Sequence, residues 1–117
     1  MRMNEVEYTD AQPIDGYGEG YFRIGGVAHE APLTVTPAGV APWGGLDDAT
    51  ALVSGAETLD VFLIGMGTDI AHIPQSLRDA LENAGVGVEV MSSPQACRTY
   101  NVLLGEGRRI GLALLPV

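Results

Sequence analysis

The chain has 117 residues, a formal net charge of −9 at pH 7, and 46% hydrophobic residues. This length predicts a single domain over residues 1–117, and the hydrophobic content is sufficient for a core. The negative charge argues against binding to nucleic acid and to anionic membrane surfaces, and no apolar run approaches the roughly 20 residues of a membrane-inserted helix.

The sequence of the N-terminal third of the chain predicts a leader that is followed by β-structure. Residues 1–15 are polar and acidic and end near Pro13, so we expect a loose segment without signal-peptide or transit-peptide character. Residues 19–36 alternate as short strands do and contain the turn-forming pair Gly25-Gly26, which predicts a β-hairpin or small β-layer. Trp43, flanked by proline and glycines, is expected to cover the core.

Beyond residue 46 the pattern alternates between short helices and buried strands. The continuous apolar stretch at 61–65 is typical of a strand that is buried on both faces. A helix separates it from the next apolar strand, so the two strands should be parallel and form a β-α-β unit. The expected order is a helix near 46–56, a strand at 59–67, a helix at 74–84, a strand at 86–91, a helix at 94–105 and a strand at 108–117.

Helix-capping residues mark two of these helix starts. Asp47 or Asp48 would cap the first helix, and Ser93 would be the N-cap of the last helix, with Pro94 at its first position. Gly105 lies near the expected end of that last helix.

The last helix carries the single cysteine on its predicted apolar face. A rotation of roughly 100° per residue places Cys97 and Tyr100 on the same side as the neighbouring apolar residues. A buried cysteine has a raised pKa and behaves as a small hydrophobe, so we expect Cys97 in the core and not as a nucleophile.

The polar edge of the same helix is the first candidate site. Glu106 would pair with an arginine such as Arg98 or Arg108, or with backbone amides, and so hold the turn into the last strand. Alternatively, a solvent-facing cluster would receive a partner or a small anion. The residues of this cluster would be Arg98, Asn101, Glu106 and Arg108.

The loop after the strand at 59–67 is the second candidate site. Glycines after a buried strand allow close approach of a phosphate, and a histidine near a carboxylate can transfer protons. The dinucleotide fingerprint is incomplete, however, because Ile70 stands where a third glycine is expected. A structural turn with a solvated loop is therefore the favoured interpretation, and a small-molecule or anion site is the alternative. Its residues would be Gly65, Gly67, Thr68, Asp69, His72 and Ser93.

Residue usage excludes several other chemistries. All six basic residues are arginines, so a P-loop lysine and a Schiff-base lysine are impossible. His29 and His72 are distant in sequence and Cys97 has no second cysteine at ligand spacing, so we expect neither a metal site nor a cofactor. The single cysteine also excludes an internal disulfide, fits a reducing compartment and predicts a cytoplasmic protein.

Four motifs carry a resemblance to a known family. They are GYGEGYFRI at 16–24, TPAGVAPW at 36–43, LIGMG at 63–67 and ACRTYNVLLGEGRR at 96–109. The chain resembles a family of small uncharacterised α/β domains, the MTH-like domains of unknown function, which includes the mitochondrial respiratory complex I assembly factor 3. The resemblance implies a three-layer α/β domain around a central mixed sheet. Ser92-Ser93 replaces the family's usual Asp-Thr pair, which keeps a helix cap but removes the acidic side chain.

The resemblance also implies a function. A non-catalytic accessory domain would act through protein partners in the assembly of a respiratory complex. The tendency of bacterial members to accompany protein-export genes points to membrane-protein biogenesis. An exposed edge of the N-terminal β-element could in addition pair with a second copy of the chain.

Overall fold

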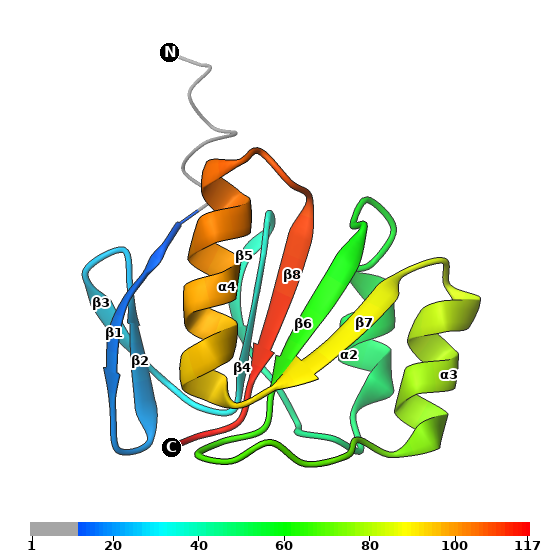
Figure 1. The fold of residues 1–117 in the computed structure, drawn as a ribbon, viewed down its shortest axis with the longest axis horizontal. Helices are drawn as coiled ribbons and strands as arrows, with labels where there is room; N and C mark the ends of the chain where they lie inside the picture. The colour runs from blue at the N-terminus through cyan, green and yellow to red at the C-terminus, as the bar shows by residue number, and fades with distance from the viewer. Residues whose placement is uncertain (1–11) are drawn as a thin grey trace.

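The computed structural model describes residues 12–117, so most of the predicted leader lies outside the described residues. The chain forms three layers around a five-stranded sheet (Figure 1). The elements are β1 (Ile14–Gly18), β2 (Tyr21–Ile24), β3 (Val27–Glu30), β4 (Leu33–Thr36), β5 (Gly39–Pro42), α2 (Ala49–Ser54), β6 (Val61–Gly65), α3 (Gln75–Asn83), β7 (Gly87–Met91), α4 (Ser93–Gly105) and β8 (Ile110–Leu114).

The large sheet is mixed and has the strand order β5-β4-β8-β6-β7. β6 pairs in parallel with both β7 and β8, whereas β4 pairs antiparallel with β8 and with β5. The strands β1, β2 and β3 form a separate antiparallel sheet. The predicted α/β fold with a parallel β-α-β unit in a central mixed sheet is therefore confirmed.

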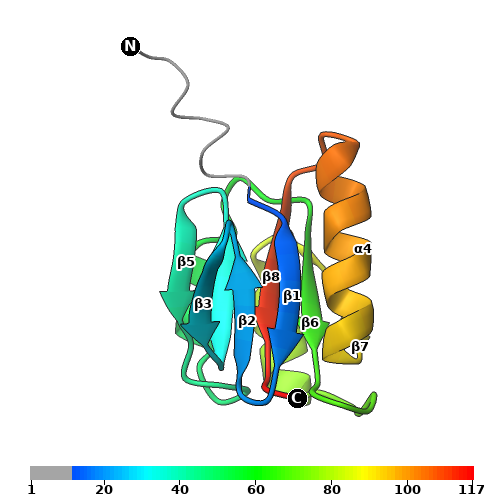
Figure 2. The same ribbon diagram turned by 90° about the vertical axis from the view of Figure 1, so that its left-hand side faces the viewer.

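The two faces of the large sheet are covered by different elements. The small sheet and α4 lie side by side over one face, as Figures 1 and 2 show, and α2 and α3 cover the other. In β6, Val61 and Leu63 belong to the first core, and Phe62 and Ile64 to the second. Because successive side chains of a strand point to opposite faces, a strand buried on both sides must be apolar throughout, and β6 is.

The predicted β-hairpin or small β-layer over 19–36 is present, but its strands belong to two different sheets. Gly25 and Gly26 do form a turn, with φ of 58° and 83°, but it joins β2 to β3. β4 leaves this layer and pairs with β8 in the large sheet, because Leu33 and Val35 are buried in its core. The alternating pattern of these strands indicated β-structure correctly, but it carried no information about which sheet each strand joins.

Two predicted boundaries are also wrong. β1 begins at Ile14, inside the predicted leader, because Ile14 is buried against α4. The N-cap of α4 is Ser92 and not Ser93, since the Ser92 hydroxyl accepts a hydrogen bond from the Gln95 amide at 3.3 Å. Pro94 therefore occupies the second helical position.

Two other local predictions are confirmed. Asp48 caps α2 by accepting a hydrogen bond from the Ala51 amide. Trp43 is buried in the core beneath α2 and α3, and its indole Nε1 donates to the Asp48 carbonyl at 3.0 Å.

Candidate functional site

Ser93 fills the predicted pocket at the carboxyl ends of the parallel strands. Its buried hydroxyl accepts a hydrogen bond from the Gly67 amide at 2.8 Å and donates one to the Leu115 carbonyl at 2.7 Å. The Ser93 amide donates to the Gly67 carbonyl at 2.7 Å, and the Leu115 amide to the Gly65 carbonyl at 2.9 Å. The chain itself thus occupies the space where open α/β sheets usually receive a ligand, and Gly65, Gly67 and Ser93 form a structural junction.

The remaining residues of that predicted site are exposed and spread along the loop. Thr68, Asp69 and His72 are all solvent-exposed. His72 lines a depression of about 270 Å³ together with Arg78 and apolar side chains, whereas Thr68 and Asp69 do not. The fold therefore does not gather the predicted loop residues into one site.

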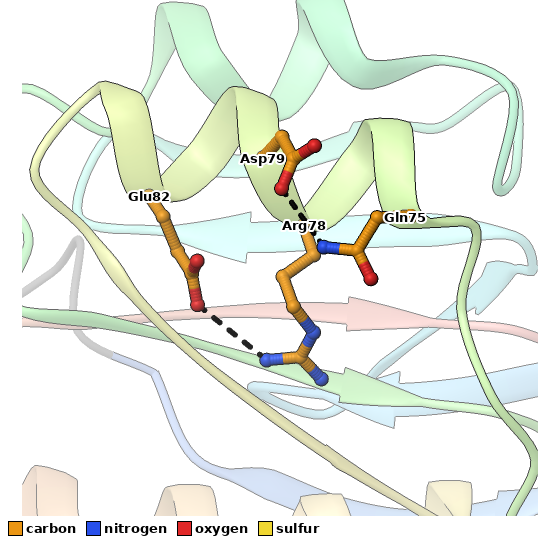
Figure 3. A network of polar contacts seen from close by, with 4 residues as sticks. All are labelled: Gln75, Arg78, Asp79 and Glu82. Atoms are coloured by element: carbon orange, nitrogen blue, oxygen red, sulfur yellow. Dashed lines mark hydrogen bonds and ion pairs between the residues drawn. The ribbon is translucent and has the colours of Figure 1, made fainter.

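Arg78 in this depression already has an acidic neighbour. Its guanidinium lies 3.6 Å from Glu82, one turn further along α3, and on the same helix Gln75 donates to Asp79 at 2.8 Å (Figure 3). Ion pairs of this i,i+4 kind on an exposed helix contribute about 0.3–0.5 kcal/mol. The polar residues of α3 thus form local contacts along the helix surface.

The predicted polar cluster of α4 separates into two pairs. Arg98 and Asn101 line a shallow depression of about 170 Å³ between α4 and β1. Glu106 and Arg108 lie beyond the end of the helix and are exposed. Within residues 12–117 no ion pair joins Glu106 to Arg98 or Arg108, so the predicted salt bridge is wrong.

Asn101 links the small sheet to α4. Its side-chain Oδ1 accepts a hydrogen bond from the Ile14 amide at 2.8 Å, and its Nδ2 donates to the Ile14 carbonyl at 2.9 Å. The Tyr100 hydroxyl adds a bond to the Gln12 carbonyl at 3.3 Å. Arg98 donates to Gln95 on its own helix at 2.8 Å. Asn101 therefore has a structural role in holding β1.

Cys97 lies in the core, as predicted. Burial raises the pKa of its thiol from 9.0 to about 12, and the nearby Arg98 guanidinium opposes this only in part. Burial likewise raises the pKa of the Tyr100 hydroxyl from 10.0 to about 12. Both groups are protonated at neutral pH, so the Cys97 thiolate is not available as a nucleophile.

These two pKa values predict how stability depends on pH. Because the unfolded chain releases both protons at lower pH than the folded chain does, the contribution of these two groups to the free energy of unfolding is fully present below pH 9 and is lost between pH 9 and about pH 12. Urea unfolding of the wild type and of Cys97→Ala across this range measures the effect. The variant should lose stability less steeply with pH, and equal slopes in the two proteins would contradict the assignment.

Sequence patterns did not indicate two features of the surface. Arg109, which directly precedes β8, forms an exposed ion pair with Asp60 before β6, at 2.8 Å. Two adjoining cavities of about 400 and 340 Å³ lie between β3 and β5, and His29 and Val40 line both. Their walls come from strands of two different sheets, so only the tertiary fold reveals them.

The part of the chain that the structure describes has neither a candidate metal site nor a candidate membrane span. Between residues 12 and 117, no three His, Cys, Asp or Glu side chains lie together in a way that could hold a metal ion. None of the helices in the same range is long and apolar enough to cross a membrane.

Comparisons with known proteins place the chain in a family. A family model described as a protein of unknown function (DUF498/DUF598) matches residues 14–115. An uncharacterised protein of Rhodobacter capsulatus is 50% identical over all of this chain and 94% of its own length. Human NADH dehydrogenase [ubiquinone] 1 alpha subcomplex assembly factor 3 is 30% identical over 99% of this chain and 67% of its own length.

The fold has solved relatives as well. A crystal structure of a Bartonella henselae protein, titled an outer membrane protein, matches with a TM-score of 0.83 and 31% identity over 91% of this chain and 95% of that one. The resemblance predicted from the four motifs is confirmed by these matches. The chain belongs to the family of proteins of unknown function DUF498/DUF598, whose relatives include complex I assembly factor 3.

Proposed function

We propose that the protein is a non-catalytic accessory domain that takes part in the assembly of a membrane respiratory complex through contacts with protein partners. The observation that carries this proposal is the 30% identity to the human assembly factor, which extends over 99% of the chain. The similarity covers every described helix and strand and not one motif alone.

The contacts of the candidate residues support the non-catalytic part of this proposal. Ser93 and the chain after β8 occupy the carboxyl ends of the parallel strands, and Asn101 is engaged by β1. Cys97 is protonated and buried. We assign the protein to the cytoplasm, since its single cysteine fits a reducing compartment.

The test is deletion of the gene from a host that contains a respiratory NADH:ubiquinone complex. We expect membranes of the deletion strain to lose most of their NADH:ubiquinone activity, and native gels to show less assembled complex. Expression of the wild-type chain from a plasmid should restore both.

The matched control is a second respiratory enzyme that does not contain this complex, such as succinate dehydrogenase, whose activity should be unchanged. Normal activity and normal assembly of the NADH:ubiquinone complex in the deletion strain would overturn the proposal.

A further inference from the structure

The layer formed by the small sheet does not fully cover the large sheet beside β3 and β5. Val27 and His29 stand opposite Ile24 and Phe22 across the β2–β3 pair, so their side chains share the inward face of the small sheet. Phe22 and Ile24 are buried, but Val27 is 57% exposed. An apolar side chain on the inward face is therefore left partly uncovered.

β5, on the other side of the gap, also has side chains on its core-facing side that are incompletely covered. Val40 and Pro42 in β5 stand opposite Val35 and Leu33 in β4, which face the core beneath the small sheet. Pro42 is nevertheless exposed, and Val40 is only partly buried. We call this opening, lined by Val27, His29, Val40 and Pro42, the β3–β5 seam; the cavities of about 400 and 340 Å³ lie along it.

Each side of the seam is a strand with a free edge. Within residues 12–117, β3 is paired only with β2, and β5 only with β4. In a two-residue hairpin the pair next to the turn, here Ile24 and Val27, exchanges backbone hydrogen bonds. The alternate residues Ala28 and Glu30 therefore direct their backbone N–H and C=O groups away from β2.

A strand added to β3 would lie over β5. Figure 2 shows β5 extending further to the side than β3, so no strand of the small sheet lies above it. Alternate side chains of an extended segment point the same way, at a spacing of about 7 Å. Two of them could enter the two cavities while the backbone pairs with Ala28 and Glu30, which is the geometry of β-strand addition.

Charge indicates the chemistry of the added strand. The chain has a formal net charge of −9. Among the residues that line the two cavities, Glu30 is the one acidic residue, it is exposed, and no arginine lies with it. This surface attracts a basic segment. It repels a second copy of the same surface, and it is not complementary to residues 1–11, which contain three acids and one arginine.

We propose that the β3–β5 seam binds an extended segment of a protein partner, which pairs with β3, places two alternate apolar side chains in the cavities and carries basic residues next to them. The inference rests on the proposed function and specifies the chemistry of the partner.

The first test uses the full chain and a fluorescent synthetic peptide of alternating arginine and valine. We expect fluorescence polarisation to detect binding, and amide NMR signals to shift mainly in residues 27–30 and 39–43. A peptide of the same composition with all arginines before all valines, and one with glutamate in place of arginine, should bind more weakly.

Three variants with unchanged net charge locate the interaction. Val27→Ser removes the inward apolar side chain, and Ala28→Pro removes a free edge amide that β2 does not use. Each should weaken binding about tenfold or more. Val102→Ser on α4 is the matched control, because Val102 is 60% exposed and lies away from the seam. Thermal unfolding of each variant verifies that the fold is retained.

Several outcomes would overturn the inference: no binding, equal binding of the block peptide, NMR shifts outside the seam, or equal weakening by Val102→Ser. A dimer of the chain that Val27→Ser dissociates would identify a second copy as the occupant and also overturn it.

The deletion strain separates this inference from the proposed function. If deletion impairs the respiratory complex but Val27→Ser and Ala28→Pro restore it fully, the seam is not the partner site and the proposed function stands. If deletion has no effect, the proposed function fails, whatever the peptide binds.

Discussion

Replacement of Gly65 by alanine is expected to destabilise the fold by about 3 kcal/mol, which is the upper range for overpacking of a core. A Cβ atom at Gly65 would lie 2.7 Å from both Cα and Oγ of Ser93 and 2.9 Å from Leu114 Cδ2. The Ser93 Cα belongs to the backbone of α4, so relief of the clash requires the whole start of that helix to move away from β6. Urea unfolding measures the loss of free energy.

Gly105→Ala is the matched control for this substitution. Gly105 is the last residue of α4, and apart from its chain neighbours and the backbone of its own helix, a Cβ atom there would meet no heavy atom within 4 Å. Its unfolding free energy should be unchanged or slightly higher, because alanine restricts the unfolded chain more than glycine does. If Gly65→Ala is as stable as Gly105→Ala, the close approach of α4 to β6 is not a requirement of the fold.

Asn101→Ala should cost about 2 kcal/mol, since it removes two hydrogen bonds and leaves both backbone groups of Ile14 without their partner. The loss should also be local. Amide hydrogen exchange in β1 should accelerate more than exchange in β6, because β1 is attached to the rest of the fold largely through α4 and β2.

Asn83→Ala provides the control for Asn101→Ala. Asn83 is an exposed asparagine at the end of α3, and its replacement should change stability by less than about 0.5 kcal/mol. Uniform acceleration of exchange across both sheets in Asn101→Ala would show that Asn101 supports the whole fold and not β1 in particular.

The parts of the fold that could be predicted from sequence are those with local causes. β6 could be recognised from its continuous apolar run, which marks a strand buried on both faces. The burial of Cys97 and Tyr100 could be recognised because their spacing places them on one face of a helix. The presence of a serine cap at the start of α4 could also be predicted from local sequence. Because positions 92 and 93 are both serine, the sequence could not show that Ser92 caps the helix and that Ser93 bonds to Gly67.

The remainder depended on contacts between distant segments. Ile14 belongs to a strand because its side chain packs in the core and its backbone amide donates a hydrogen bond to Asn101. Asn101 lies 87 positions further along the chain. β4 joins the large sheet because β8 pairs with it there. Of the predicted cluster on α4, the structure brings together only Arg98 and Asn101. Glu106 and Arg108 lie beyond the end of the helix, so helical spacing could not place them. The β3–β5 seam depends on how two sheets overlap, which no local pattern encodes.

The position of β8 has a consequence for biosynthesis. β8 lies between β4 and β6, so the last of the strands described in residues 12–117 to be synthesised occupies the middle of the large sheet. Until it emerges from the ribosome, β4 and β6 each lack a neighbour, and Leu33, Val35 and Leu63 cannot complete their core. Domains that depend on such long-range pairing fold slowly, and their unpaired strand edges remain exposed until the partner strand has been synthesised. The nascent chain should therefore need protection by a chaperone until β8 is available to pair with β4 and β6.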